Sequence, residues 1–210
     1  MIKILIGDDH VLIREGLKKV LKSEKDMSVV AEAENASDVL KFVQEKQLDI
    51  VVLDITMPGR SGLDILKELK KFHPKLPVLV LSMHAEERYA VRALKAGASG
   101  YLTKQSAGDE LVAAIRKVVS GGKHISTKLA ERLASELEKP KEKAYHETLS
   151  NREYQVFCKI ASGESIQDIA EELSLSQSTV NTYRQRVMEK MHMSTNAELI
   201  RYALEYQLID

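Results

Sequence analysis

The chain has 210 residues, of which 44% are hydrophobic and 30% charged; this balance excludes a disordered or fibrous protein, and the length favours two domains. The 31 basic and 31 acidic residues cancel, so bulk charge gives no argument for a nucleic-acid partner and any such argument has to be local. No stretch approaches the roughly 20 apolar residues of a membrane span, and the short apolar run after Met1 lacks the features of a signal peptide, so we expect a cytoplasmic protein.

The first 120 residues alternate short apolar runs with amphipathic helical stretches, which predicts repeated βα units around a parallel sheet. Several of the runs are almost continuously apolar, as strands buried on both faces are. The expected strands are Lys3–Gly7, Ser28–Ala33, Ile50–Leu53, Val78–Leu81 and Gly100–Leu102. We therefore expect a doubly wound, flavodoxin-like α/β domain with a five-stranded parallel sheet at residues 1–121. Its binding crevice should lie at the carboxyl ends of the strands.

The rest of the chain has a helical pattern only. A helical stretch at Lys128–Leu137 precedes the charged, proline-broken segment Glu138–Lys143, and we expect residues 122–147 to be a linker with a helical segment. Three capping patterns of the form [Ser/Thr]-x-x-[Asp/Glu] stand just before apolar helical periodicity. They begin at Ser150, Ser165 and Thr195. Residues 148–210 are therefore expected to form an all-α domain of four helices.

Polar residues follow four of the expected strands. They are Asp8 and Asp9 after the first, Asp54 after the third, Ser82 after the fourth, and Thr103 and Lys104 after the fifth. Because these strand ends share one edge of a parallel sheet, three carboxylates, a hydroxyl and an ammonium should converge there. Such carboxylates repel one another unless a cation lies among them, and a set of oxygen ligands favours a hard ion such as Mg²⁺.

A second interpretation is that each aspartate only caps a helix or forms a turn, as single aspartates often do. Capping alone does not require an acidic pair, a third acid, a hydroxyl and a lysine in this strand order. The joint pattern instead indicates phosphoryl chemistry. One carboxylate can attack phosphorus while a metal ion and Lys104 neutralise the phosphoryl oxygens.

The whole first domain resembles a two-component receiver. The residues that carry this resemblance are Asp8-Asp9, Leu53–Gly59 around Asp54, Ser82, Ala96-Gly-Ala98 and Lys104. The resemblance implies that Asp54 is the phosphoacceptor, that Ser82 and Lys104 contact the phosphoryl group, and that Tyr101 turns inward when they do. It also implies Mg²⁺ ligands from Asp9, Asp54 and the Thr56 carbonyl, with Asp8 nearby or acting through water.

Two positions depart from the receiver pattern. Gln105 follows Lys104 where many receivers have proline, so a cis peptide bond is not expected there. Met83 follows the switch serine where a smaller residue is frequent. This larger side chain would restrict access to the phosphoryl group.

In the second domain, Ser165–Lys190 has two helical patterns separated by a short turn. Ser176 can cap the second helix, whose apolar face carries Val180, Tyr183, Val187 and Met191. The opposite face is a hydrogen-bonding stripe with basic edges, suited to reading base edges while cations hold phosphates. The expected DNA-binding residues are Ser176, Gln177, Ser178, Thr179, Asn181, Thr182, Arg184, Gln185, Arg186 and Lys190.

An ordinary helical hairpin with a solvated face gives the same pattern. From Leu149 to Asp210 there are six Lys or Arg residues and nine Asp or Glu residues, a net charge of −3. Binding to DNA would therefore have to depend on the basic cluster at 184–190, on helix N-termini and on dimer avidity.

The second half also resembles a known domain, the LuxR-type helix-turn-helix. The matching residues are Leu149–Glu153, Ala161–Gly163, Asp168–Ala170, Leu175-Ser176, Ser178–Val180 and Ala197–Leu199. The two halves together resemble the NarL/FixJ family of response regulators, and Thr179–Arg184 is similar to the GacA/UvrY subgroup. The resemblance implies dimer contacts through the last helix, Thr195–Tyr206, with an apolar seam of Leu199, Tyr202 and Tyr206.

We therefore expect a response regulator that accepts phosphate from a histidine kinase and binds double-stranded DNA as a phosphorylation-promoted dimer. Its own chemistry should be limited to self-phosphorylation from small donors and autodephosphorylation. One alternative is an aspartyl-phosphate hydrolase, although such enzymes carry an Asp-x-Asp motif and Thr56 stands two residues after Asp54. A second alternative is an adaptor whose helical domain binds protein.

Overall fold

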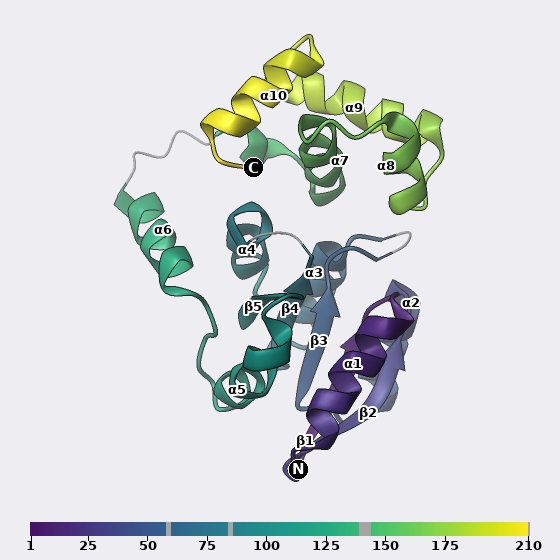
Figure 1. Cartoon of the computed structure of the whole chain (residues 1–210), viewed down its shortest axis with the longest axis vertical. Coiled ribbons are helices and arrows are strands. Elements are labelled where there is room, and N and C mark those ends of the chain that lie inside the picture. Colours follow the sequence, from purple (N-terminus) through teal and green to yellow (C-terminus); the bar gives the residue numbers. More distant parts are fainter. Residues whose placement is uncertain (58–59, 84–85, 139–143, 210) are drawn as a thin grey trace. The chain divides into compact units, whose positions relative to one another are not determined.

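The computed structural model covers the whole chain and describes all residues except 58–59, 84–85, 139–143 and 210 (Figure 1). Part of the expected receiver motif, Pro58 and Gly59, and most of the expected proline-broken linker segment, residues 139–143, therefore lie outside the described residues. The chain divides into two compact units, Met1–Ala134 and Ser135–Asp210.

The first unit contains a five-stranded parallel sheet with the strand order β2-β1-β3-β4-β5. The strands are β1 (Ile2–Gly7), β2 (Met27–Ala33), β3 (Ile50–Asp54), β4 (Val78–Ser82) and β5 (Gly100–Thr103). Each contains the expected strand and extends it by one residue. The strand order and the parallel pairing confirm the doubly wound architecture. The central strands β3 and β4 are buried along their whole length, as strands of a parallel sheet covered on both faces are.

Helices cover both faces of this sheet (Figure 1). They are α1 (Val11–Lys22), α2 (Ala36–Glu45), α3 (Gly62–Phe72), α4 (Glu86–Lys95) and α5 (Ala107–Val119). The apolar stripes of α1 and α5 share one core with alternate residues of the sheet, including Ile4, Val52 and Leu81. Side chains alternate between the faces of a strand, so the intervening strand residues pack toward α2, α3 and α4.

The start of α3 lies against the end of β3. The Gly62 amide donates a hydrogen bond to the Ile55 carbonyl at 3.0 Å, and Ser61 caps α3 by accepting from the Leu63 amide. A Cβ added at Gly62 would lie 2.1 Å from the Asp54 carbonyl oxygen. Position 62 therefore has to be glycine for α3 to begin this close to Asp54.

The remaining elements are helical, as expected. They are α6 (Thr127–Glu138), the 3-10 helix η1 (Tyr145–Thr148), α7 (Asn151–Ala161), α8 (Ile166–Glu172), α9 (Gln177–Met191) and α10 (Asn196–Glu205). Capping boxes are present at Ser150, Ser165 and Thr195, so the three predicted helix starts are confirmed. No helix in the described ranges is long and apolar enough to cross a bilayer.

In the second unit, α7 packs against α9 and α10, and α8 packs against α9. The predicted dimer seam on α10 is wrong in two of its three residues. Leu199 is fully buried and Tyr202 is 7% exposed, because both side chains belong to the core of this unit, where the Tyr202 ring lies 6.4 Å from that of Phe157. The large apolar side chains that α10 and its C-cap expose are Leu204 and Tyr206.

Candidate functional site

The predicted convergence of polar side chains occurs at the carboxyl edge of the sheet. The Lys104 ammonium lies 2.8 Å from Asp54 Oδ2 and 2.6 Å from Asp8 Oδ2. All three side chains are at most 3% exposed. Burying one ammonium between two carboxylates leaves an excess negative charge at a site with little water, and such a site attracts a further cation.

Asp54 is held through both of its carboxylate oxygens, because Oδ2 accepts from Lys104 and Oδ1 accepts from the Thr56 amide at 3.0 Å. Burial raises the pKa of Asp54 to about 6, with the Asp8 charge adding to the shift and Lys104 opposing it. Burial would lower the pKa of Lys104, but the carboxylates of Asp54 and Asp8 outweigh it and raise that pKa above its ordinary value. At neutral pH the site therefore holds an ionised carboxylate and a charged lysine.

Asp9 and His10 complete a cluster with Asp8 and Asp54. One potential ligand atom from each residue lies within 4.8 Å of the others. The His10 Nδ1 atom is 2.9 Å from Asp9 Oδ1 and 3.2 Å from Asp8 Oδ1. The three carboxylates are the hard oxygen donors that a small divalent cation prefers, and the partly exposed Asp9 leaves a side open for water ligands.

His10 is absent from the set predicted from strand ends, which contains oxygen ligands only. The signal that could have included it is its position directly after Asp9. Its side chain is 57% exposed, so it lies at the rim of the cluster.

Arg14 contacts the backbone of Asp8. Its Nη1 donates to the Asp8 carbonyl at 2.7 Å, and the guanidinium also pairs with Glu34 and lies 3.5 Å from Glu32. The side chain is 7% exposed, an unusual position for arginine unless its charge is paired. Arg14 therefore fixes the backbone that presents Asp8, and the helical pattern of α1 contained no signal for this role.

Ser82 and Tyr101 occupy neighbouring strands. Ser82 ends β4 in register with Thr103, and its carbonyl accepts from the Lys104 amide at 2.7 Å. Ser82 and Tyr101 are both buried. Met83 is 62% exposed, and within the described residues there is no cis peptide bond, so Lys104-Gln105 is trans.

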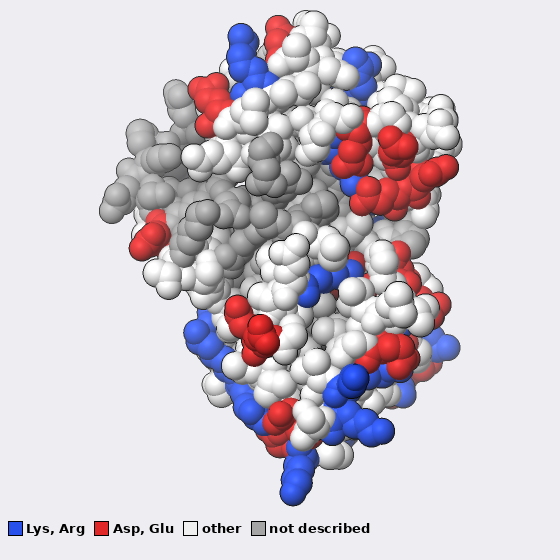
Figure 2. All heavy atoms as spheres, in the orientation of Figure 1, with Lys and Arg blue, Asp and Glu red and all other residues white. Residues whose placement is uncertain are grey.

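The polar stripe on α9 is accessible. Ser176 caps the helix by accepting from the Thr179 amide, while Val180, Val187 and Met191 are buried. The exposed members of the predicted stripe are Ser176, Gln177, Ser178, Asn181, Thr182, Gln185, Arg186 and Lys190. Acidic side chains gather instead over α8, where Asp168, Glu171 and Glu172 are exposed (Figure 2).

The three cations at 184–190 differ in their engagement. Lys190 forms a bidentate pair with Glu153 of α7, at 2.6 and 2.9 Å, and Glu153 is 5% exposed. Arg184 donates to Asn196 at 2.9 Å, and the Arg186 guanidinium lies 6.0 Å from the centre of the Tyr183 ring. Lys190 therefore stabilises the domain through Glu153 while its side chain stays 43% exposed, and Arg186 is also exposed on the stripe.

Two family models match this chain. The response regulator receiver domain matches residues 4–116, and the family described as bacterial regulatory proteins, luxR family, matches residues 147–203. The chain therefore belongs to the two-component response regulators that join a receiver domain to a LuxR-type helix-turn-helix domain, and the predicted resemblance is confirmed.

Individual relatives agree with this family. Response regulator GacA from Pseudomonas aeruginosa is 36% identical over 100% of this chain and 99% of its own. Response regulator UvrY from Escherichia coli is 35% identical over 99% of this chain and 96% of its own. A LuxR-family response regulator structure from Aurantimonas sp. SI85-9A1 is 34% identical with a TM-score of 0.60, covering 65% of this chain and 98% of its own. RcsB from Salmonella enterica, 24% identical with a TM-score of 0.64 and coverage of 96% and 98%, shares the fold.

Proposed function

We propose that Asp54 accepts a phosphoryl group from the phosphohistidine of a histidine kinase. The observation that carries this proposal is the buried Asp54 carboxylate, ion-paired with Lys104 at 2.8 Å and adjacent to Asp8 and Asp9. A carboxylate that is ionised at neutral pH, although burial raises its pKa to about 6, is a competent nucleophile.

In the transfer, an oxygen of Asp54 bonds to phosphorus while the phosphorus–nitrogen bond to the kinase histidine breaks and its electron pair stays on the imidazole. Lys104 balances negative charge on the phosphoryl oxygens, which is the main contribution that a protein makes to this reaction. Asp9, Asp54 and the Thr56 carbonyl, with Asp8 nearby, would hold Mg²⁺. When bound, the ion supplies further charge neutralisation at the same oxygens.

Ser82 and Tyr101 then form the switch. Ser82 ends β4, the strand that pairs with the one carrying Asp54, so we assign its hydroxyl to the new phosphoryl group. Tyr101 follows on the adjacent strand and is 1% exposed, which is the inward position that the proposal assigns to it after phosphorylation.

The output is DNA binding by residues 148–210, with residues 1–121 as the receiver and 122–147 as the linker. The exposed face of α9 supplies donors and acceptors for base edges, and Arg184 and Arg186 supply phosphate contacts. RcsB, which has the same fold, has been solved bound to promoter DNA with a phosphomimetic. Since this domain carries a net charge of −3, we expect a dimer to be needed for tight binding in the cytoplasm.

Labelling with acetyl phosphate and Mg²⁺ tests the receiver half. Wild-type protein should gain one acid-stable, base-labile phosphate, and this phosphate should be lost slowly by autodephosphorylation. Asp54→Asn should gain none, and Asp9→Ala should lose both labelling and its Mg²⁺ dependence because a hard-cation site then has too few oxygens. The exposed Asp49→Asn, at the opposite end of β3, is the matched control. Equal labelling of Asp54→Asn and wild type would refute the assignment.

Gel shifts on pools of random double-stranded DNA test the output half. Phosphorylated protein should retain DNA, and Arg186→Gln should weaken retention. If neither the phosphorylated nor the unphosphorylated protein retained DNA, binding of the helical domain to a protein partner would replace the DNA-binding proposal.

A further inference from the structure

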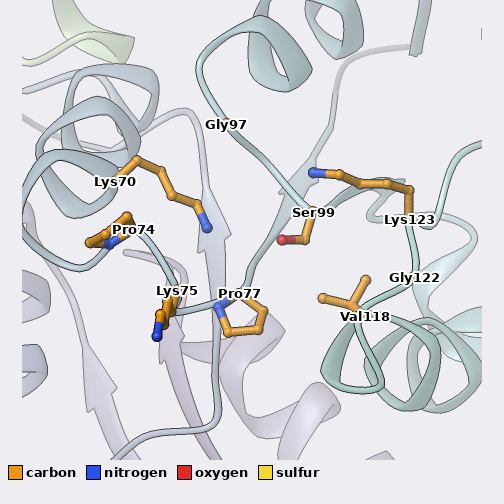
Figure 3. A pocket seen from close by; sticks show the side chains of 10 residues that line it. Lys70, Pro74, Lys75, Pro77, Gly97, Ser99, Val118, Gly122 and Lys123 are labelled. Atoms are coloured by element: carbon orange, nitrogen blue, oxygen red, sulfur yellow. The ribbon is translucent and has the colours of Figure 1, made fainter.

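A pocket lies at the edge of the receiver sheet opposite to Asp54 (Figure 3). Two of its lining residues, Pro77 and Ser99, come directly before β4 and β5, whereas Asp54 and Ser82 end β3 and β4. Its cavity of about 380 Å³ is within the range of small-molecule sites. All of its lining residues belong to the first unit, so it is a feature of the receiver alone and separate from the acidic cluster.

Two lysines reach into this pocket from opposite sides. In Figure 3 the ammonium groups of Lys70, on α3, and Lys123, after α5, point toward the space beside the Ser99 hydroxyl. Lys123 is held in place because the neighbouring His124 donates its amide to the Ser99 carbonyl at 3.1 Å and accepts from the Tyr101 amide at 3.1 Å. The cations are therefore positioned by sheet-like backbone pairing on one side and by a helix on the other.

Each ammonium uses a carbonyl as its anchor. Lys70 Nζ donates to the Leu76 carbonyl and Lys123 Nζ to the Ala98 carbonyl, both at 2.6 Å. An ammonium has three N–H donors, so these bonds leave donors on both groups for a ligand. These hydrogen bonds fix the positions of the two ammonium groups. A neutral donor could satisfy the same carbonyls, so carbonyl binding alone does not account for two positive charges at one pocket.

The residues that line the pocket offer no carboxylate to neutralise these charges. None of the 10 residues that line it is acidic, and Lys75 adds a third cation. The pKa of Lys70 is lowered mainly by burial, and the like charge of Lys123 adds to the shift. Gly97 has a φ of +101°, and an added Cβ would lie 2.9 Å from Lys70 Cγ; glycine here lets the lysine stem lie against the loop.

We propose that this pocket binds a small molecule that carries a phosphate group, with Lys70, Lys123 and the Ser99 hydroxyl as its hydrogen-bond donors. A phosphate dianion matches a pair of ammonium groups in charge, and its oxygens accept several charge-assisted hydrogen bonds at once. The pocket is open to solvent, and its volume of about 380 Å³ fits a small molecule, whereas a protein segment needs a more extended surface. Neither Asp54 nor Mg²⁺ takes part in this binding.

The test is a titration of the full-length protein followed by amide nitrogen–proton NMR spectra, in EDTA and at constant ionic strength. The probes are inorganic phosphate and glucose 6-phosphate, with glucose as the neutral match. Amide shifts should saturate at Gly97, Ser99, Gly122 and Lys123 with either phosphate and not with glucose. Tighter binding of glucose 6-phosphate would identify an organic phosphate as the ligand class, and equal binding would identify free phosphate.

Lys70→Gln and Lys123→Gln should each weaken binding roughly tenfold or more, because each removes a charged donor. Glutamine can still donate to the anchoring carbonyl, and thermal melting checks that each variant is folded. Should one variant fail to fold, the other and Ser99→Ala carry the test. Lys67→Gln, an exposed lysine on the same helix, should leave binding unchanged.

Shifts that never saturate, or that persist equally in the Lys70, Lys123 and Lys67 variants, would overturn the proposal by showing unspecific ion association. Saturation by a polyglutamate peptide, with no response to either phosphate, would also overturn it and would identify an acidic protein segment as the partner.

Discussion

Replacing Asp54 by asparagine should stabilise the protein in the absence of Mg²⁺. Asp54 is 1% exposed, and burial raises its pKa from 3.8 to about 6. A folded-state pKa above the unfolded value means that ionisation weakens folding. The penalty is absent below pH 3.8, grows as the pH rises through about 6, and is complete above it. At 1.36 kcal/mol per pH unit, the shift corresponds to about 3 kcal/mol at most.

The assay is urea or thermal unfolding of wild type and Asp54→Asn between pH 4 and pH 8 in EDTA. The variant should be more stable by about 1–3 kcal/mol at pH 8, and the two curves should approach each other toward pH 4. Adding Mg²⁺ should stabilise wild type more than the variant, because a ligand that binds only the folded state adds to its stability. The exposed Asp49→Asn is the control. A variant that is less stable than wild type at pH 8 would show that the ion pair with Lys104 outweighs the burial of Asp54.

Three further predictions concern positioning, DNA contact and assembly. Arg14→Met should release the Asp8 carbonyl, and it should therefore weaken Mg²⁺ binding and slow phosphorylation roughly tenfold. The control, Lys18→Met, loses only surface pairs with Glu15 and Glu32 and should have neither effect. Equal effects of the two variants in magnesium titrations would refute a role of Arg14 through Asp8. Lys190→Gln should destabilise the helical domain by about 1 kcal/mol, because it leaves Glu153 buried without its cation. Arg186→Gln should reduce the salt dependence of DNA binding by about one ion. Unfolding and filter-binding data in which Arg186→Gln destabilised the domain and Lys190→Gln changed the salt dependence would contradict these assignments. With a beryllofluoride mimic, sedimentation should show a shift toward dimer, and binding should tighten ~10²–10⁴-fold more on a two-half-site DNA than on one half-site; equal tightening on both would instead indicate release of an inhibited α9.

The sheet was predictable because its signal is local. A run such as Ile50–Leu53 is apolar throughout and is bounded by polar residues, which suffices to define a buried parallel strand. Once the strands are known, the topology brings Asp8, Asp54 and Lys104 together, since all follow strand ends on the same edge. The capping boxes were predictable for the same reason, because each lies within four consecutive residues.

The features that the sequence did not reveal depend on contacts between distant residues. Lys190 was expected to contact DNA, and its ion pair with Glu153, 37 residues earlier, was not foreseen. Arg14 follows Ile13 on a helix whose periodicity cannot distinguish a solvated arginine from a buried one. The same ambiguity misplaced Leu199 and Tyr202, because an apolar stripe on α10 fits a partner chain and the domain core equally well.

The close approach of Gly62 to the Asp54 carbonyl has a consequence for anyone who transplants or recombines this receiver. With 2.1 Å between the carbonyl oxygen and any Cβ at position 62, every other amino acid there would displace the backbone of the nucleophile itself. Saturation mutagenesis should thus find position 62 intolerant even of alanine, while the half-exposed Arg60, two residues earlier, accepts many side chains. A chimera joined between β3 and α3 would separate the nucleophile from the glycine that accommodates it, so the crossover belongs before β3 or after the first turn of α3.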